Sequence, residues 1–389
     1  MEAINNFIHT AYVNYGNWGI ALAAILLVLF ITQLVFHLGI YGRVASFRLT
    51  SRKQIRDTEP PISVVVTMFA EEADYLDTGL MQLLGQNYSD FEVVVVYVGD
   101  SEDFFSELKY ITRISPHLTP IHLRTNPSYV IKKKMAINVG IKSAKYDHIV
   151  MTTTDATPTS NKWLSLIAKG FLYGDVVLGY SGIAYNAGFD NFIFREYRIT
   201  NSVAWLSAAI RRKTYSASHS AFGFTRNLYL NARGFNHLDM EVGEDDLLVQ
   251  QIATRDNVSV VLAPSATCRE RVWGGWKWWA NEVGRQRLTH RYYPRMTLAV
   301  MFVEQLSRVL FFGFSIAAFA TMQWEYCAVV VALLFLRYFA VMFASIRIWQ
   351  RLGETRLVAL HPLYDIAEPF IRLYIILHSK LIAKRAWRV

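Results

Sequence analysis

The sequence predicts a mixed α/β domain built on a mainly parallel sheet, with membrane-spanning helices attached at both of its ends. Between residues 60 and 294, short apolar runs rich in β-branched residues alternate with segments of helical spacing. That alternation is typical of a parallel sheet with helices on both faces. Long apolar segments lie on either side of this region, and their length and composition indicate the membrane helices.

The predicted elements follow one another in a regular order. We expect strands at residues 62–66, 91–98, 121–123 and 148–152, and helices at 71–84, 104–114 and 133–143. In such sheets, ligands bind at the carboxyl ends of the strands. Asp100 and Asp155 each come just after a predicted strand, so we expect both side chains at that edge.

The composition places the chain at a membrane surface. Of its 389 residues, 53% are hydrophobic and only 18% are charged, which is too apolar for an ordinary soluble protein and too polar for an all-membrane one. The net charge is +9, and the basic residues flank the apolar segments, which favours anionic lipid over nucleic acid as their partner. These flanking residues are Arg43, Arg48, Arg52, Lys53, Arg56, Arg347, Arg351, Arg356, Lys380, Lys384, Arg385 and Arg388.

Three apolar segments are predicted to cross the membrane. Residues 19–40 have no formal charge and are long enough for a hydrocarbon core of ~30 Å. The basic residues after them place the N-terminus outside and the central domain in the cytosol. The second segment, 298–322, contains Glu304 and Arg308, which are one turn apart and can pair on a protein-facing side. The third covers residues 326–348.

The last stretch, residues 357–380, is open to two interpretations. An amphipathic helix lying in the interface is favoured, because a fourth crossing would put the basic C-terminal tail outside. The predicted organisation is therefore an N-terminal segment and membrane helix, a cytosolic domain, two membrane helices, and an interfacial or crossing helix with a basic tail. The corresponding ranges are 1–44, 45–294, 295–350 and 351–389. Cys268 and Cys327 are too isolated to predict a disulfide or a metal cluster.

An acidic cluster is the strongest chemical signal in the central domain. Glu244, Asp245 and Asp246 are adjacent, and like charges this close raise one another's pKa. Such a carboxylate can take a proton from a hydroxyl, although a solvated helix start is the alternative, since acids suit the helix dipole. A tryptophan-rich stretch and Arg285 follow about forty residues later. Acids for a metal or proton, with arginine for phosphate, predict phosphate-linked chemistry at a membrane surface.

In their order, these motifs resemble the membrane-bound family 2 glycosyltransferases, the group that includes cellulose, chitin and hyaluronan synthases and ceramide glucosyltransferase. The resemblance extends from residue 62 to residue 295. It rests on Ala70-Glu71-Glu72, Gln86-Asn87-Tyr88 with the strand after it, Lys133-Lys134-x-Ala136, Thr153-Thr154-Asp155-Ala156-Thr157-Pro158 with Trp163-Leu164, Gly243-Glu244-Asp245-Asp246, and Glu282-x-x-Arg285-Gln286.

The resemblance implies a GT-A-like (Rossmann-like) fold and a metal-dependent inverting hexosyltransferase that uses a nucleotide-sugar, with UDP as the first candidate. Asp155 matches the second aspartate of the Asp-x-Asp motif and would bind Mg²⁺ or Mn²⁺. Asp245 would be the catalytic base, with Glu244 and Asp246 in the same motif. The residues implied in donor binding are Glu71, Asp100, Lys134, Thr153, Arg285 and Gln286. Those implied in acceptor binding are Trp276 and Trp279.

Three positions depart from the family pattern. Val98 stands where the uridine-contacting aspartate is usual, and Thr153 replaces the first aspartate of Asp-x-Asp. Gln286 replaces the tryptophan that supports the acceptor sugar in processive synthases. This replacement favours a single transfer to a lipid or lipid-linked acceptor over polymer synthesis, and a saccharide acceptor is the alternative. The alternatives are a processive polysaccharide synthase that secretes its product, and a non-catalytic membrane subunit that works with partner subunits.

Several of these residues also have simpler interpretations. Asp155 can cap the following helix or turn, Arg285 can anchor lipid head groups, and the tryptophans can form an interface belt. Lys133 and Lys134 can be a solvated face instead of a phosphate clamp. The expected location is an integral membrane protein with its catalytic domain in the cytosol, at the inner membrane if the source is bacterial.

Overall fold

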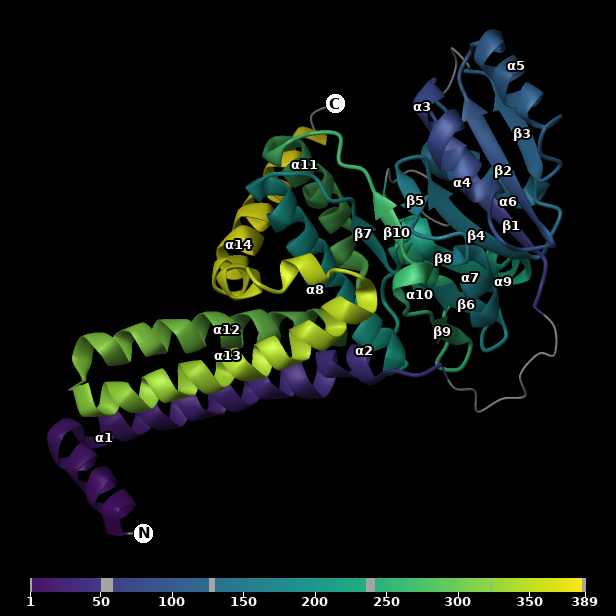
Figure 1. Ribbon diagram of the computed structural model, residues 1–389. Helices are drawn as coiled ribbons and strands as arrows, with labels where there is room; N and C mark the ends of the chain where they lie inside the picture. Colours follow the sequence, from purple (N-terminus) through teal and green to yellow (C-terminus); the bar gives the residue numbers. More distant parts are fainter. Residues whose placement is uncertain (1, 50–58, 126–129, 236–241, 323, 387–389) are drawn as a thin grey trace.

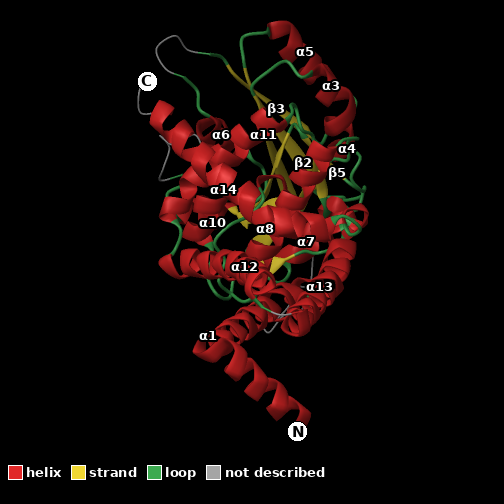
Figure 2. Cartoon of the chain, turned by 90° about the vertical axis from the view of Figure 1, so that its left-hand side faces the viewer, coloured by secondary structure: helices red, strands yellow, loops and turns green. Residues whose placement is uncertain are grey.

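The computed structural model describes residues 2–49, 59–125, 130–235, 242–322 and 324–386. A sheet domain lies at one end of the molecule, and three long helices run side by side at the other (Figure 1). These helices are α1 (Glu2–Leu34), α12 (Arg295–Thr321) and α13 (Trp324–Leu352). The first part of α1 turns away from the others at Gly16 (Figure 2), where φ is +57°. Among the basic residues that flank the apolar segments, Arg52, Lys53, Arg56 and Arg388 fall outside the described residues.

The main sheet has seven strands in the order β3-β2-β1-β4-β8-β6-β9. Its strands are β1 (Ile62–Met68), β2 (Phe91–Val98), β3 (Leu118–Leu123), β4 (His148–Thr153), β6 (Val176–Leu178), β8 (Phe222–Thr225) and β9 (Val258–Val260). Strands β1 to β4 are parallel, whereas β8 runs antiparallel to both β4 and β6. Every residue of β1 and β2 is buried, as expected of strands covered by helices on both faces. The mixed α/β class predicted from the sequence is confirmed.

A second, three-stranded sheet lies beside the first. It is formed by β5 (Ala156–Pro158), β10 (Cys268–Glu270) and β7 (Ser181–Ile183), with β10 in the centre. Strand β10 is antiparallel to β5 and parallel to β7. Because β5 begins three residues after β4 ends, this small sheet extends the carboxyl edge of the main one.

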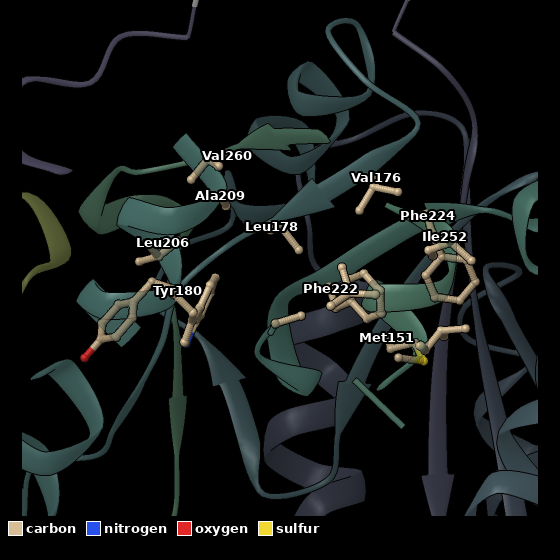
Figure 3. Close-up of a cluster of buried hydrophobic side chains, with 14 of the residues drawn as sticks. Met151, Val176, Leu178, Tyr180, Leu206, Ala209, Phe222, Phe224, Ile252 and Val260 are labelled. Atoms are coloured by element: carbon tan, nitrogen blue, oxygen red, sulfur yellow. The ribbon is translucent and has the colours of Figure 1, made fainter. Parts of the chain in front are cut away.

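Helices of the domain cover the sheet and build its core. They are α3 (Ala73–Tyr75), α4 (Met81–Leu84), α5 (Glu102–Ile111), α6 (Lys133–Ser143), α7 (Trp163–Phe171), α8 (Phe189–Ile210), α9 (Arg226–Asn231), α10 (Asp246–Ile252) and α11 (Trp276–Gln286). Leu206 and Ala209 of α8 join a core cluster that includes Leu178 and Phe222 of the sheet (Figure 3). The predicted helix at 71–84 begins later, at Ala73, and a π-helical segment, η2 (Leu76–Leu80), separates α3 from α4.

Three helices are long and apolar enough to cross a membrane, which is consistent with a membrane protein. They span Gly16–Ser46, Arg295–Thr321 and Tyr326–Leu352, close to the three segments predicted from the sequence. The first span continues past α1 through a π-helical segment, η1 (Val35–Tyr41), into α2 (Gly42–Ser46). Helix α14 (His361–Ala386) is not among these three; it packs against α11 and α8 and also touches α12 and α13.

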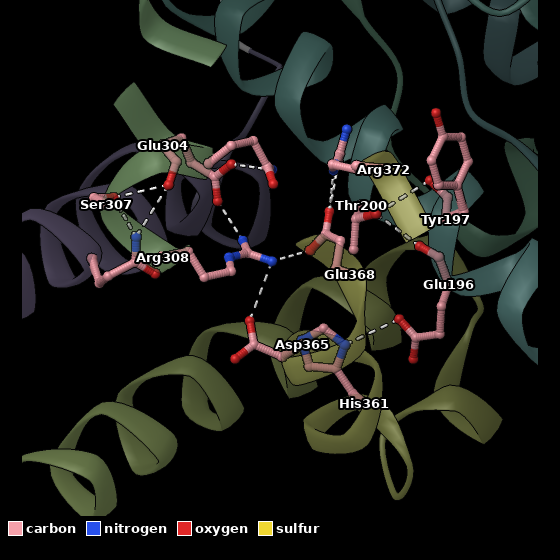
Figure 4. A network of polar contacts seen from close by, with 12 residues as sticks. Glu196, Tyr197, Thr200, Glu304, Ser307, Arg308, His361, Asp365, Glu368 and Arg372 are labelled. Carbon is pink, nitrogen blue, oxygen red and sulfur yellow. Dashed lines mark hydrogen bonds and ion pairs between the residues drawn. The ribbon is translucent and has the colours of Figure 1, made fainter. Parts of the chain in front are cut away.

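Glu304 and Arg308 of α12 and Arg337 of α13 are buried. They lie in a polar network where the long helices meet α14 and α8 (Figure 4). Arg308 forms ion pairs with Glu304, one turn away, and with Glu368 of α14, so the predicted pairing of Glu304 with Arg308 is confirmed. Arg337 of α13 lies 2.5 Å from the carboxylate of Asp365. Because isolated charges are costly in an apolar setting, this network fixes how α14 sits on the long helices.

Candidate active site

Asp155 lies in the turn between β4 and β5, at the carboxyl edge of the sheet. The hydroxyl of Thr153, the last residue of β4, donates a hydrogen bond to its carboxylate. The backbone carbonyl of Asp155 accepts a hydrogen bond of 2.8 Å from the N–H of Arg271. The side chain is half-buried. Asp155 therefore lies at the edge of the sheet where we expected it, and Thr153 orients its carboxylate.

A second carboxylate stands close to Asp155 on the neighbouring strand. Glu270 ends β10 and lies opposite Ala156 in the strand register. It accepts hydrogen bonds of 2.8 Å from both Ser181 and Ser220, and Arg198 of α8 lies 2.7 Å away. The hydroxyl of Ser220 is 3.1 Å from that of Thr153, so two adjacent hydroxyls lie between the two carboxyl groups. Burial, followed by the charge of Glu270, raises the pKa of Asp155 to about 6.

The acidic cluster lies at the start of α10, and its three members have different surroundings. Asp246 is buried and accepts hydrogen bonds from Thr289 (2.5 Å) and Tyr293 (2.7 Å). Glu244 is buried and lies 2.6 Å from the ammonium of Lys133. Burial favours the neutral form of Glu244, but the charge of Lys133 outweighs it and lowers the pKa of this carboxyl to about 2. Asp246 and Glu244 are thus held by protein partners.

Asp245 is the half-buried member of the cluster. One of its oxygens accepts a hydrogen bond of 2.7 Å from the backbone N–H of Asp246. Burial, together with the charges of Asp246 and Glu244, raises the pKa of Asp245 well above its ordinary value. Desolvation and neighbouring negative charge therefore both increase the affinity of this carboxylate for a proton.

Lys133, the first residue of α6, is influenced by the acids of both segments. Burial would lower the pKa of its ammonium, but the charges of Glu244, Asp245 and Asp155 raise it. The same ammonium therefore feels the carboxylate of the β4–β5 turn and the carboxylates at the start of α10. Asp155 and Asp245 thus lie in one electrostatic environment, on segments that the sequence separates by about ninety residues.

The other residues expected in donor binding have varied positions. Asp100 is exposed and accepts a hydrogen bond of 2.9 Å from the backbone N–H of Thr125. Glu71 is exposed, whereas its neighbour Glu72 accepts a hydrogen bond of 3.1 Å from Thr154, next to Asp155. Lys134 is only 2% exposed, so a solvated face does not describe it.

Arg285 and Gln286 lie at the end of α11 and are exposed. Arg285 pairs with Glu282 at 2.5 Å, and Gln286 donates to the other oxygen of Glu282 at 3.3 Å. The 3₁₀ segment after α11, η5 (Arg287–Tyr292), carries the Thr289 that binds Asp246. The end of α11 is thus connected to the acidic cluster through η5.

The two tryptophans expected at the acceptor belong to a hydrophobic cluster of α8, α11 and α14. Trp279 is 3% exposed and is stacked on Phe194, with ring centroids 4.6 Å apart. The ring of Tyr197 packs edge-on against that of Trp279. This packing does not favour the acceptor role that we expected for Trp279. Trp276 is half-buried, 5.1 Å from Trp279 between ring centroids.

Four residues of the site have no definite role in the sequence-based prediction. The sequence allows Lys133 to be either a solvated residue or a phosphate clamp, although its position at a helix start is visible there. Ser220 and Glu270 lie next to or in strands of three or four residues, which give no periodic signal. His219 contributes a buried Nδ1 without a hydrogen-bond partner among the described residues, and burial followed by the charge of Lys133 lowers its pKa to about 3.

The carboxyl edge of this mixed sheet, where open α/β sheets bind their ligands, carries acids and a lysine. Residues 63–226 match the family model described as glycosyl transferase family 2. The resemblance seen in the sequence motifs is therefore confirmed over this region. The comparison with curated proteins gave no match.

Solved structures share the fold. One is the mannosyltransferase PcManGT from Pyrobaculum calidifontis in complex with GDP-Man and Mn²⁺, which is 18% identical with a TM-score of 0.54. The match covers 88% of this chain and 99% of that one. Another is TarS 1-349 of S. aureus in complex with UDP-GlcNAc, 16% identical with a TM-score of 0.42, covering 77% of this chain and 89% of that one. At these identities, the likeness to PcManGT shows the GT-A fold alone.

Proposed function

We propose that the protein is a membrane-bound, inverting hexosyltransferase that moves a sugar from a nucleoside-diphosphate sugar to a lipid or lipid-linked acceptor. The observation that carries this proposal is the shared environment of Asp155, Asp245 and Lys133 at the carboxyl edge of a family 2 domain. Helices long and apolar enough to cross a membrane are joined to that domain, so an acceptor in the bilayer would be close to it. UDP is the first candidate for the nucleotide.

Asp155 is our candidate ligand for Mg²⁺ or Mn²⁺. Burial and the charge of Glu270 together raise the pKa of its carboxyl to about 6. A bound cation would therefore stabilise the charged form of this carboxylate. Mg²⁺ and Mn²⁺ prefer carboxylate, phosphate and water oxygens. Among the described residues, no group of three or more His, Cys, Asp or Glu side chains is placed to hold a metal, so a donor diphosphate and waters would complete the ligand set. The cation would neutralise charge on the departing diphosphate.

Asp245 is our candidate base. Asp246 is held by Thr289 and Tyr293, and Glu244 is held by Lys133, which leaves Asp245 to face the acceptor. As an acceptor hydroxyl oxygen attacks the anomeric carbon, its proton would pass to the Asp245 carboxylate. The bond between that carbon and the diphosphate oxygen would break on the opposite side, which inverts the anomeric centre.

The remaining residues are proposed to bind the donor and the membrane. Lys133 would donate to diphosphate oxygens while it keeps its ion pair with Glu244, and Arg285 would do so after release from Glu282. Asp100 would contact the uridine, because the side chain of Val98 offers it no acceptor. Trp273 and Trp278, which are 57% and 37% exposed, are close in sequence to the buried Trp279 and suit a membrane interface. The basic ends of the spanning helices would place the domain in the cytosol.

Donor turnover tests this function. Purified protein in detergent or nanodiscs, with Mn²⁺, would be offered UDP- and GDP-linked sugars, and the release of nucleoside diphosphate would be measured. We expect release from at least one donor, stimulated by lipid extract and lost with EDTA. Protein that neither binds nor turns over any donor, and that co-purifies with other subunits, would support the non-catalytic alternative. A broad distribution of long products would support the processive synthase instead.

A further inference from the structure

The loop after the last spanning helix, α13, inserts a buried carboxylate into the small sheet of the domain. Glu354 is 0% exposed, although it lies in a connecting loop. One of its oxygens accepts from Arg195 at 2.5 Å, and the other accepts from Arg269 and from Tyr180. Arg269 also donates to the backbone carbonyls of Leu352 and Gly353, at 3.2 and 2.9 Å. Arg195 and Arg269 of the domain therefore hold the loop that follows α13.

The backbone on both sides is shaped for this contact. Gly353 has φ of +73°, a conformation that glycine adopts without strain, and the N–H of Glu354 donates to the carbonyl of Trp349 at 2.7 Å. On the other side, Gly182 of β7 lies opposite Arg269 in the strand register. A Cβ atom at Gly182 would collide with both the guanidinium of Arg269 and the carboxylate of Glu354. The ion pair thus occupies the space that a side chain would fill.

Strand β10 connects this pair to the candidate active site. Arg269 and Glu270 are consecutive in β10, so their side chains point to opposite faces. Arg269 faces Glu354, while Glu270 accepts from Ser220, whose hydroxyl is 3.1 Å from Thr153. Thr153 in turn donates to Asp155. Helix α8 adds a parallel connection, because Arg195 binds Glu354 and Arg198, one turn later, binds Glu270.

We propose that Glu354 is a positioning residue for the donor site: by holding Arg195 and Arg269, it fixes Glu270, and through Ser220 and Thr153 it sets the carboxylate of Asp155. A shift of the loop between α13 and α14 would then move the carboxylate of Asp155 and weaken its binding of the cation and the donor. This inference rests on the proposed binding of a cation and a diphosphate at Asp155.

The experiment measures Mn²⁺ binding to detergent-purified protein in the presence of UDP and, separately, GDP, by calorimetry or by the electron paramagnetic resonance signal of free Mn²⁺. Glu354→Gln keeps the shape but removes the charge, and Glu354→Asp keeps the charge but shortens the reach. We expect Mn²⁺ affinity to fall about tenfold or more in Glu354→Gln, the effect known for groups that orient metal ligands, and less in Glu354→Asp. Asp256→Asn, which breaks an exposed pair with Arg212, is the matched control and should bind as wild type does.

A double-mutant cycle separates positioning from a general loss of structure. Ser220→Ala removes the hydroxyl between Glu270 and Thr153 without touching the loop. If Glu354 acts through this chain, Glu354→Gln and Ser220→Ala together should weaken Mn²⁺ binding little more than the stronger single change. Should Glu354→Gln fail to give monodisperse protein, Glu354→Asp takes its place in the cycle.

Two outcomes would overturn the inference. One is wild-type Mn²⁺ affinity in folded Glu354→Gln, and the other is full additivity with Ser220→Ala. Either result, obtained while the wild-type protein binds Mn²⁺ with nucleoside diphosphate, leaves the proposed function intact. Absence of any such binding by the wild-type protein would instead remove the proposed function and the inference together.

Discussion

The ammonium of Lys133 lies 2.6 Å from the carboxylate of Glu244, although 111 residues separate the two in the sequence. The charges of Asp245 and Asp155 act on the same ammonium. A single lysine therefore balances part of the negative charge of three carboxylates. Its removal should affect both the stability of the domain and the binding of the donor.

Replacing Lys133 by methionine should leave Glu244 buried without a counter-ion, and its pKa should rise. Because Lys133 is 37% exposed, we expect a modest loss of stability, about 1 kcal/mol. Donor turnover should fall by about tenfold or more if Lys133 contacts the diphosphate. The apparent melting temperature and nucleoside diphosphate release are the measurements. Lys133→Met combined with Glu244→Gln should regain stability but not turnover, and recovery of turnover would argue against the phosphate contact.

Asp155→Asn should abolish cation-dependent turnover while sparing the fold. The pKa of Asp155 is raised from 3.8 to about 6, so ionisation of this carboxyl costs the folded state stability as pH rises through that window. Without added cation at neutral pH, the neutral asparagine should therefore be as stable as wild type or more stable, by about 1 kcal/mol. Thermal melting with and without Mn²⁺ checks this: wild type should gain from Mn²⁺ with UDP or GDP, and Asp155→Asn should not.

Replacement by asparagine should have different effects at the two adjacent aspartates: loss of turnover at Asp245 and loss of stability at Asp246. Asp245→Asn should lower turnover by about 10²-fold or more, because the base is lost, while nucleotide binding and melting temperature are retained. Asp246→Asn should weaken the bonds from Thr289 and Tyr293 and cost about 1 to 3 kcal/mol of stability. Turnover assays and melting curves on both variants, run side by side, test the assignment. Retained turnover in folded Asp245→Asn would move the base elsewhere.

His219 should make the domain sensitive to mild acid. Its pKa is lowered from 6.5 to about 3 by burial and by the charge of Lys133, so the folded state disfavours its protonation. The free energy of unfolding is therefore not reduced by this group above the pKa that His219 has in the unfolded chain. Below that pKa it falls by about 1 kcal/mol per pH unit for one such group. Between about pH 7 and pH 5, the melting temperature of His219→Gln should fall less than that of wild type. Parallel curves for the two proteins would contradict this role.

Much of the domain could be predicted from local pattern. The bounds of β2 and α6 agree with the predicted ranges, and β1 extends the predicted strand by two residues. These elements have strong local signals, either continuous β-branched runs or clear helical spacing. Strand β8 was not predicted, and it inserts antiparallel between β4 and β6. Its four residues, Phe222–Thr225, have no period that distinguishes a strand from any other buried segment.

The roles within the acidic cluster could not be predicted in the same way. Glu244, Asp245 and Asp246 are equivalent by composition, and all three are reasonable candidates. What distinguishes them is that Thr289 and Tyr293 bind Asp246, and that Lys133 binds Glu244. These partners are tens of residues away, so only the packing of η5 and α6 against α10 singles out Asp245 as the candidate base.

The sequence by itself determined the kinds of element, the helices long and apolar enough to cross a membrane, and the presence of acids at the carboxyl edge of the sheet. Those properties depend on hydrophobic period, segment length and the residue that follows each strand, all of which are local. The tertiary structure alone decided which acids of the cluster have side-chain partners, and it placed Glu354 on Arg269, 85 residues away. Such pairings follow from which surfaces pack together once burial is complete, and no local pattern encodes that choice.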